Sequence, residues 1–345
     1  MNTHDTRLSA RSGNVDMTHG GGGRAMNDLI RDVFNRHLSN SALDAGNDAA
    51  MLGRHTGRIV VSTDGHVISP LFFPGGDIGS LAVHGTLNDV AMSGARPIAL
   101  TAGFILEEGF PLADLERIVV SMAAAARKAG VPVVTGDTKV VEKGKGDGVF
   151  ITTSGIGVVP DGVEISGERA RPGQAILLSG TIGDHGVAIL SKRENLEFET
   201  EILSDSAALH TLVAAMVDAV PGIAVLRDPT RGGIAATLNE IARQARVGML
   251  LDEASIPLKA DVSAACELLG LDPLYVANEG KLICICDEAD AERLLEVMRA
   301  HPNGTDAARI GAVTDDENAL VQMRTGFGGT RVVDWLAGEQ LPRIC

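Results

Sequence analysis

The order of apolar and polar positions along the first half of the chain predicts alternating helices and strands. After the glycine-rich stretch HGGGGRAM (19–26), apolar residues recur at the spacing of an amphipathic helix. A second helix, at 74–97, should end at Gly94 and Pro97, which do not favour its continuation. The other elements predicted here are a strand at 58–64, a helix at 112–130, a buried strand at 131–141 and, after a polar loop, a strand at 149–159.

The same alternation starts again after RARPGQ (169–174), which is the best candidate for a domain boundary. A strand at 175–180 leads through a glycine-rich turn into a helix. A strand at 223–228 precedes a helix that should begin at Pro229, since proline favours the first helical position. The pattern predicts an α/β (α+β) fold. Its predicted parts are a disordered leader at 1–17, an N-terminal domain at 18–168, a C-terminal domain at 169–323 and a flexible tail at 324–345.

The predicted tail is broken by glycines and is too short to form a domain. Its apolar residues should hold part of it against the protein, while its tip, with Cys345, should move freely. The residues expected to make this contact are Val332, Val333, Trp335 and Leu336.

Composition and charge narrow the possible functions. A length of 345 residues suits about two domains, and the net charge of −15 repels phosphate backbones, which argues against nucleic-acid binding. No apolar run reaches the roughly 20 residues needed to cross a bilayer. The N-terminal stretch also lacks the apolar core of a secretory signal. We therefore expect a cytoplasmic protein without a membrane partner.

Cys345 is the cysteine whose position suggests chemistry. Cys284 and Cys286 alternate on one face of the strand-like KLICICDE, and a C-x-C pair without a second pair does not suit zinc. We expect these two and Cys266 to be buried packing residues. Cys345 ends the chain, and its own α-carboxylate disfavours a thiolate. Arg343 is the nearest basic residue that could offset this effect.

Carboxylates recur at the ends of the predicted elements. Taken singly, each could be a helix cap or a turn residue. Asp89 is harder to explain in this way because it lies on the apolar stripe of the helix at 74–97, where it needs an arginine, a helix N-terminus or a metal as partner. Oxygen donors without paired histidines suit Mg²⁺ better than zinc or iron. The candidate acids are Asp48, Asp64, Asp89, Asp137 and Asp228, with Asn88 as a further oxygen donor.

The glycine runs HGGGGR and GTIGDHG could supply the other half of a nucleotide site. Successive backbone N–H groups can face an anion, and a following helix N-terminus adds its dipole. Neither run is a Walker A or Rossmann fingerprint, and taken alone each is better explained as a mobile loop. Together with the acids and Mg²⁺, they would form an ATP site without a P-loop.

Several motifs, in order along the chain, identify a known family. TDGHVISPLFFPGGDIGSLAVHGTLNDVAMSGARP, GFILEEG, VVTGDTKVV, LRDPTRGG, NEGKL and the final PRIC resemble the HypE family of hydrogenase-maturation proteins, within the PurM-like (aminoimidazole-ribonucleotide-synthetase-like) ATP-binding superfamily. The resemblance runs from about Thr18 to Cys345. It implies a PurM-like two-domain fold with an N-terminal ATP-binding domain, a C-terminal α/β domain and a mobile C-terminal tail. It also implies a homodimer that binds ATP and Mg²⁺.

The resemblance further implies a reaction on the chain's own end. The carbamoyltransferase HypF would load a carbamoyl group onto Cys345, and ATP-dependent dehydration would convert it to a thiocyanate. The cyano group would then pass to iron on the HypC–HypD complex, as a cyanide ligand for a [NiFe] hydrogenase. By match to the family motifs, Glu279 would abstract protons and Lys139 would be the catalytic lysine. A chain end suits such a carrier because it can reach several partners.

The nucleotide and Mg²⁺ positions are likewise carried over from the family. They are Asp48, Asp64, Asp89, Asp137 and Asp228, with Asn88, Thr138 and Arg231 as helpers and Gly21, Gly22 and Gly23 as the phosphate-side loop. His84 stands where a small residue or cysteine is expected, and it is given no role.

Two alternatives stay open. The first is another PurM-like ATP-dependent enzyme. Selenophosphate synthetase is disfavoured because it needs a reactive residue near the N-terminus, whereas the first cysteine here is Cys266. The second is a non-catalytic scaffold that only presents a thiol. The presence of both Lys139 and Glu279 argues against it.

Overall fold

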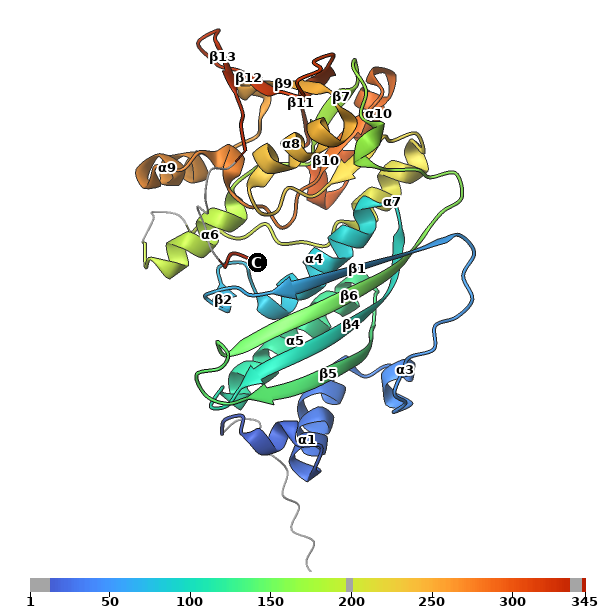
Figure 1. Ribbon diagram of the computed structural model, residues 1–345, viewed down its shortest axis with the longest axis vertical. Helices are drawn as coiled ribbons and strands as arrows, with labels where there is room; N and C mark the ends of the chain where they lie inside the picture. Colours follow the sequence, from blue (N-terminus) through green and yellow to red (C-terminus); the bar gives the residue numbers. More distant parts are fainter. Residues whose placement is uncertain (1–12, 197–200, 336–342) are drawn as a thin grey trace, which may run out of the picture.

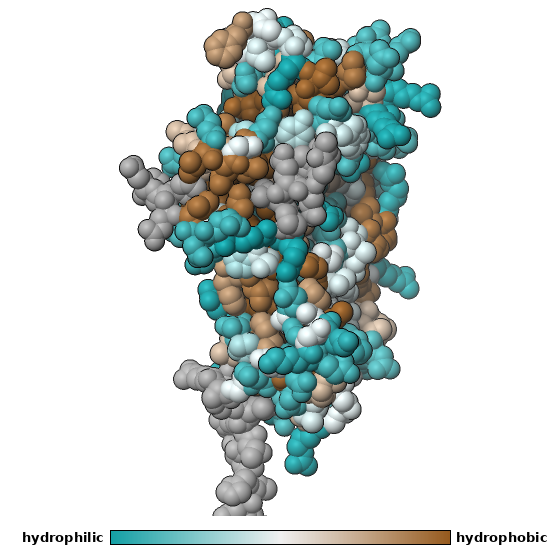
Figure 2. Space-filling model, turned by 60° about the vertical axis from the view of Figure 1, so that its left-hand side comes forward, coloured by the Kyte–Doolittle hydropathy of each residue, from teal (hydrophilic) through white to brown (hydrophobic). Residues whose placement is uncertain are grey.

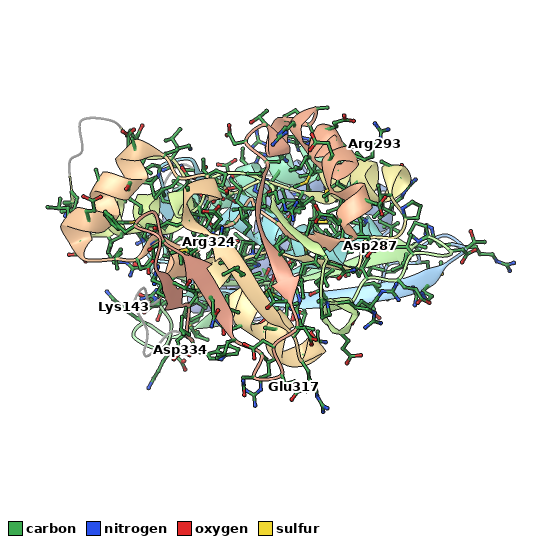
Figure 3. All side chains as sticks on the ribbon, turned by 90° about the horizontal axis from the view of Figure 1, so that it is seen from above. Lys143, Asp287, Arg293, Glu317, Arg324 and Asp334 are labelled. Atoms are coloured by element: carbon green, nitrogen blue, oxygen red, sulfur yellow. The ribbon has the colours of Figure 1, made fainter. Side chains whose placement is uncertain are left out.

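The computed structural model describes residues 13–196, 201–335 and 343–345. Two α/β domains lie one above the other along the long axis, and the C-terminus returns between them (Figure 1). One face of the surface mixes apolar and polar residues (Figure 2). Charged side chains such as Lys143, Arg293 and Glu317 lie at the periphery, where they are exposed (Figure 3). Within the described residues, no helix is long and apolar enough to cross a membrane.

The N-terminal domain is built on a four-stranded sheet in the order β1-β6-β4-β5. Its strands are β1 (Arg58–His66), β4 (Arg96–Glu107), β5 (Val133–Val141) and β6 (Val149–Val159). β6 pairs antiparallel with β1 and β4, and β4 pairs parallel with β5. Side chains alternate along β1, so that Ser62 and Asp64 face the helices while Ile59 and Val61 are exposed on the outer face.

The helices α4 (Ile78–Met92) and α5 (Leu112–Ala129) cover the inner face of this sheet. Asp77 begins α4 by accepting hydrogen bonds from Gly79 N (2.7 Å) and Ser80 N (3.1 Å). The prediction of a helix at 74–97 was therefore too long at both ends. The strands β2 (Phe72–Phe73) and β3 (Gly76–Asp77) precede α4, Gly94 leaves the helical conformation with a φ of 76°, and Arg96 begins β4.

The prediction of a buried strand at 131–141 holds only for its start. Val133 and Val134 are buried, but Asp137 and Lys139 are exposed. The physical reason is the sheet order: β5 is an edge strand, and the described residues leave its outer face uncovered.

The N-terminal segment packs beside β5 and α5. Its short helices are η1 (Met17–Gly20), α1 (Arg24–Leu29), the π-helical η2 (Ile30–Asn35), α2 (Arg36–Leu38) and α3 (Ser41–Asp44). The Phe34 ring meets Phe104 edge-on, with centroids 4.9 Å apart. Of the predicted disordered leader, residues 1–12 lie outside the described residues. For 13–17 the prediction was wrong, because Val15 is buried and exchanges backbone hydrogen bonds with Gly109 and Phe110.

The C-terminal domain has a seven-stranded sheet in the order β13-β12-β9-β11-β7-β10-β8. Its strands are β7 (Ala175–Leu178), β8 (Val225–Arg227), β9 (Gly248–Asp252), β10 (Ile283–Cys286), β11 (Ala308–Thr314), β12 (Val321–Arg324) and β13 (Thr330–Val332). Its helices are α6 (Asp184–Arg193), α7 (His210–Ala219), α8 (Gly233–Ala245), α9 (Ala260–Leu269) and α10 (Ala291–Arg299).

The cysteine pattern on β10 is confirmed. Cys284 and Cys286 face the core shared with α7 and α10, whereas Ile283 and Ile285 face the core under α8. Both cysteines are fully buried, and Cys266 is buried in a separate small cluster. All four cysteines of the chain are free thiols.

The helix predicted to begin at Pro229 begins at Gly233 instead. Gly232 and Gly233 both have positive φ angles, so the chain turns there before the helix starts. At Gly233 the backbone also approaches the next segment closely, because an added Cβ would lie 2.4 Å from Leu274 O. Proline at 229 therefore precedes a glycine turn rather than opening a helix.

The predicted tail is partly built into the second sheet. β12 and β13 pair antiparallel, which takes Arg324 and residues 330–332 into the domain. Val333 is fully buried, whereas Val332 and Trp335 are half-exposed. Leu336 lies outside the described residues. In this structure residues 343–345 are docked between the domains, and the mobility expected of the tip stays a prediction.

Candidate active site

The end of the chain is held by backbone hydrogen bonds. Val67 N donates to Cys345 O (2.9 Å), and Ser69 N donates to Arg343 O (3.3 Å). The His185 ring donates from Nε2 to Ile344 O at 2.8 Å, and the Ile344 side chain is 3% exposed. The tail tip therefore fills a cleft between the segment after β1 and the start of α6.

Docking changes the chemistry of the Cys345 thiol. Burial, followed by the nearby Glu279 carboxyl, raises the pKa of Cys345 to about 12, although Arg231 acts in the opposite direction. Arg343 does not assist the thiol, since its guanidinium pairs with Asp147. The docked thiol is thus neutral at physiological pH. This environment suits a thiol that already carries a group better than one about to attack.

Glu279 lies beside this thiol on a fixed backbone. Asp205 accepts hydrogen bonds from Glu279 N (3.0 Å) and Gly280 N (3.3 Å). The Glu279 side chain is only 4% exposed, and its Oε1 has no hydrogen-bond partner among the described residues. Burial, then Asp228, raises the pKa of Glu279 well above its usual value. A buried, unpaired carboxyl is costly, which marks this position as functional rather than structural.

Three of the predicted acids converge on the same site. Asp89 accepts a hydrogen bond from Ser62 Oγ (2.7 Å), and burial, then Asp64, raises the pKa of Asp89. Burial also raises the pKa of Asp64, and burial followed by Asp89 raises that of Asp228 to about 7. Gly85 leaves room for them: a Cβ there would lie 3.6 Å from Asp64 Oδ2 and 3.9 Å from Glu279 Oε2.

Asn88 has a different position from the one expected of a nucleotide ligand. Its amide donates to Ala207 O (3.0 Å) and Glu279 O (3.2 Å), and its oxygen accepts from Leu209 N (2.8 Å). The side chain is buried and joins α4 to the C-terminal domain. These contacts occupy both of its amide hydrogens, so Asn88 fixes the backbone of Glu279. The groups that remain to face the candidate nucleotide site are the carboxylates of Asp64, Asp89 and Asp228.

A second group of predicted residues lies at the opposite edge of the first sheet. Lys139 pairs with Asp137 (2.7 Å), and this contact lowers the pKa of Asp137. Thr138 is buried and, with Asp137, lines a cavity of about 120 Å³ under α1. The glycine loop lies next to it, since a Cβ at Gly20 would be 3.0 Å from Val140 N.

The loop glycines Gly21, Gly22 and Gly23 are exposed, with open space around the last two. The structure therefore does not bring Lys139, Asp137 or this loop to Cys345 within one chain, because two strands separate β5 from β1. Asp48 lies in the exposed segment between α3 and β1.

The second glycine run does not form an anion cradle. Gly183 N donates to Asn278 Oδ1 (2.8 Å), and Gly186 N donates to Ala277 O (3.1 Å). Its N–H groups therefore fix the turn before α6 to the segment that carries Glu279.

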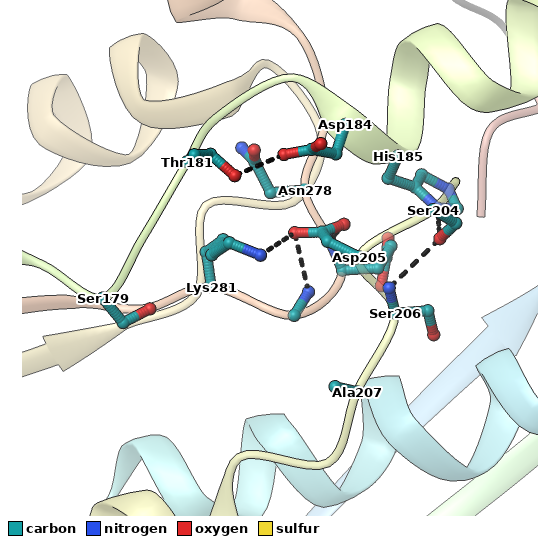
Figure 4. Close-up of polar contacts among 12 residues, drawn as sticks. Ser179, Thr181, Asp184, His185, Ser204, Asp205, Ser206, Ala207, Asn278 and Lys281 are labelled. Carbon is teal, nitrogen blue, oxygen red and sulfur yellow. Dashed lines mark hydrogen bonds and ion pairs between the residues drawn. The ribbon is translucent and has the colours of Figure 1, made fainter. Parts of the chain in front are cut away.

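Sequence reasoning missed the residues that hold this segment in place (Figure 4). Lys281 and Asp205 form a buried ion pair at 3.0 Å, and Lys281 helps to keep the pKa of Asp205 low despite its burial. Ser204 Oγ lies 2.8 Å from His185 Nδ1. Lys281 lies in the NEGKL motif, but Ser204, Asp205 and His185 have no distinctive spacing that could have identified them.

Comparisons with known proteins agree with this architecture. The family model for the AIR synthase related protein, N-terminal domain, matches residues 46–159, and that for its C-terminal domain matches residues 171–323. The chain is 70% identical to carbamoyl dehydratase HypE of Azotobacter vinelandii over 340 residues, which covers 99% of this chain and 100% of that protein. It is 45% identical to carbamoyl dehydratase HypE of Escherichia coli K12 over 337 residues, covering 96% and 99%.

Solved structures of HypE proteins also have the same fold as this chain. A crystal structure of hydrogenase maturation protein HypE in complex with ATP superposes with a TM-score of 0.92, at 53% identity, and covers 95% of this chain and 99% of that one. The HypE chain of a HypE–HypF complex superposes with a TM-score of 0.79, at 50% identity, covering 89% and 99%. Family models, sequence identity and fold agree, and the chain belongs to the HypE family of carbamoyl dehydratases within the AIR synthase related proteins.

Proposed function

We propose that the chain is an ATP-dependent dehydratase that acts on a carbamoyl group carried by its own Cys345. The product would be a thiocyanate on the same sulfur, which donates cyanide to the iron centre of a [NiFe] hydrogenase. The observation that carries this proposal is the docked position of Cys345 beside Glu279, whose buried Oε1 has no partner among the described residues. Relatives named carbamoyl dehydratase support it.

Loading and dehydration would need two positions of the tail. A thiol with its pKa raised to about 12 is a poor nucleophile at neutral pH, so Cys345 would accept the carbamoyl group outside the cleft, where its pKa is ordinary. The docked position would hold the loaded, uncharged sulfur. The hydrogen bonds to Val67, His185 and Ser69 would fix the last residues in that position.

In the docked position, Glu279 would remove protons from the carbamoyl nitrogen. Removing both N–H protons and the carbonyl oxygen converts S–C(=O)–NH₂ to S–C≡N, and phosphorylation of that oxygen by ATP makes it a leaving group. Glu279 Oε1 could accept these protons because it makes no hydrogen bond among the described residues. Burial of Glu279 raises its pKa, so it must lose its proton as positive charge arrives in the site.

Mg²⁺ with ATP would supply that charge. Among the described residues no three potential ligands are already arranged around a metal position, so the ion would arrive with the nucleotide. The donor set nevertheless fits: Asp64, Asp89 and Asp228 are oxygen ligands whose pKa values are raised by burial and, at Asp89 and Asp228, also by the neighbouring acids. A divalent cation would relieve this repulsion and stabilise charge on the transferring phosphate.

A homodimer would join the two separated groups of residues. The outer face of the first sheet exposes Ile59 (56%), Val61 (65%) and Ile105 (43%), which is unusual for a lone β-sheet surface. Both β1 and β5 are edge strands. A second copy covering this face could bring its Lys139 and Asp137 beside the acids of the first copy, where Lys139 would contact the phosphates.

The proposed partners follow from the same relatives. A HypE–HypF complex has been solved for a protein 50% identical to this chain, which supports HypF as the donor of the carbamoyl group. We propose the HypC–HypD complex as acceptor of the cyano group, and the cytoplasm as the compartment, where reducing conditions would keep Cys345 free.

Intact-protein mass spectrometry tests the proposal. Cys345 is carbamoylated with HypF, or chemically with cyanate, and Mg-ATP is then added. Loss of one water from the tail peptide, only with ATP and only with Cys345 present, is the expected result. Cys345→Ala controls for carbamoylated amines and should fold and bind ATP normally. A carbamoyl group that persists while ATP is bound would leave the thiol-carrier scaffold as the function.

A separate variant tests the metal role. Asp89→Asn removes one ligand charge and should weaken Mg-ATP binding by about tenfold, measured by calorimetry with and without Mg²⁺. Unchanged affinity would show that Asp89 does not bind the metal-nucleotide complex.

A further inference from the structure

A second cavity, of about 260 Å³, lies between the two domains away from the thiol of Cys345. α4 and α5 line it from the N-terminal domain. The segment before α7 and the short helix η7 (Pro302–Gly304) line it from the C-terminal domain. The 204–209 segment separates this cavity from Glu279, since Ser206 and Ala207 line it while Ala207 N contacts Glu279 O (3.4 Å). None of the residues assigned to catalysis lines it.

The polar lining of this cavity is basic. Three imidazoles (His84, His210 and His301) and the Lys128 ammonium line it, and no acidic residue does. Burial lowers the pKa of His84 to about 4, with Lys128 and His210 as further causes. Burial also lowers the pKa of His210 and His301. The cavity therefore brings together basic groups whose protonation is disfavoured by burial and by one another. A bound anion would offset this effect by supplying negative charge.

Hydrogen bonding fixes how these rings are protonated. His301 Nδ1 accepts from Asn303 N (3.1 Å), so Nε2 carries the hydrogen toward Thr211 Oγ1 (3.1 Å). His210 Nε2 lies 3.0 Å from Ala129 O, which can only accept, so Nε2 carries its hydrogen as well. The neutral His210 ring therefore presents Nδ1 as a bare acceptor. This atom is buried and has no hydrogen-bond partner among the described residues.

From the cavity, its basic lining and this unpaired acceptor, we propose that the cavity binds a small oxyanion that keeps a proton, of the hydrogenphosphate type. Its O–H group would donate to His210 Nδ1, and its other oxygens would accept from Lys128. The volume is several times that of a water molecule, about 30 Å³, so an ion of this size fits. Sulfate has the same shape but carries no proton at neutral pH, so it cannot satisfy Nδ1 of a neutral ring.

Calorimetric titration of the full chain with sodium phosphate or sodium sulfate at pH 7.5, at constant ionic strength, tests the proposal. Phosphate should bind at least tenfold more tightly than sulfate. NMR of histidines labelled at Cε1 should show the His210 signal, assigned by its loss in His210→Gln, moving with phosphate. Because burial and His301 oppose protonation of His210 and no lining residue is acidic, sulfate should approach phosphate only at acidic pH, where His210 can become a donor.

The variants separate this site from the nucleotide site. Lys128→Gln changes an exposed side chain and should weaken phosphate binding at least tenfold without loss of folding. His210→Gln should abolish the preference for phosphate over sulfate, while Mg-ATP binding stays unchanged in both variants. Equal binding of the two anions at pH 7.5, or phosphate binding unaffected by Lys128→Gln, would overturn the proposal. No binding at tens of millimolar phosphate would show a cavity that holds water alone.

Discussion

Replacing His185 with phenylalanine should release the docked tail. The imidazole is fully buried, donates to Ile344 O (2.8 Å) and lies 2.8 Å from Ser204 Oγ. Phenylalanine keeps the edge-on packing against the Phe73 ring, whose centroid is 5.6 Å away, but removes both hydrogen bonds. The carbonyl of Ile344 would then be buried without a partner only while the tail is docked, since water reaches it once the tail leaves.

The expected shift of the docking equilibrium follows from the free-energy cost of burying the Ile344 carbonyl without a partner in the docked tail. An unsatisfied buried polar group costs about 1–3 kcal/mol. At 1.4 kcal/mol per factor of ten, the docking equilibrium should shift toward the free tail by about 5- to 150-fold. The carbonyl of Ser69 and that of Arg343 still accept from Arg193, so part of the docking contact remains.

The assay is the alkylation rate of Cys345 with iodoacetamide, followed on the tail peptide by mass spectrometry. The docked thiol is partly buried and has its pKa raised to about 12, so the reagent reacts mainly with the free tail. His185→Gln, whose amide can donate from nearly the same place as Nε2, should restore much of the protection. His55→Phe, at an exposed position, is the matched control. An alkylation rate within twofold of the parent in His185→Phe, with unchanged Tm, would refute a holding role for His185.

Three further substitutions test the structure around the site. The pKa of Asp228, raised to about 7, means that the unfolded chain ionises first, so this carboxyl reduces stability as pH rises from about 3.8 to 7. A shift of about three pKa units corresponds to about 4 kcal/mol, so Asp228→Asn should be more stable than the parent by roughly that amount at pH 8 and nearly equal to it at pH 4 in urea unfolding; a pH-independent difference would contradict this. Lys281→Met leaves the buried Asp205 carboxylate unpaired and should cost about 3–5 kcal/mol in the same assay, whereas a loss below 1 kcal/mol would show that the pair contributes little. Gly280→Ala would place a Cβ 1.8 Å from Asp205 O and should cost about 3 kcal/mol and most dehydratase activity, while Gly222→Ala, which meets nothing within 4 Å, should be neutral.

Local patterns determined several features of this protein from the sequence alone. The alternation at Cys284 and Cys286 set the faces of β10 because strand side chains alternate whatever the neighbours are. The break at 169–174 predicts a domain boundary, and β7, the first strand of the second sheet along the chain, begins directly after it. The family motifs identified Glu279 and Cys345, which the fold then places together although 65 residues separate them in the chain.

Other features of the structure depended on contacts between segments that are far apart in the sequence. A local pattern could not show that β5 is an edge strand, that Asn88 bridges the domains, or that the tail tip docks against His185, because each fact depends on the sheet order or on a distant segment. Asp137 and Asp64 both follow strand-like runs, yet they lie at opposite edges of the sheet. Raised pKa values at Glu279 and Asp228 also arise only after folding, since burial and mutual repulsion require the acids to be brought together. The sequence thus determined which chemical groups are present, and the tertiary structure decided which of them act on one another.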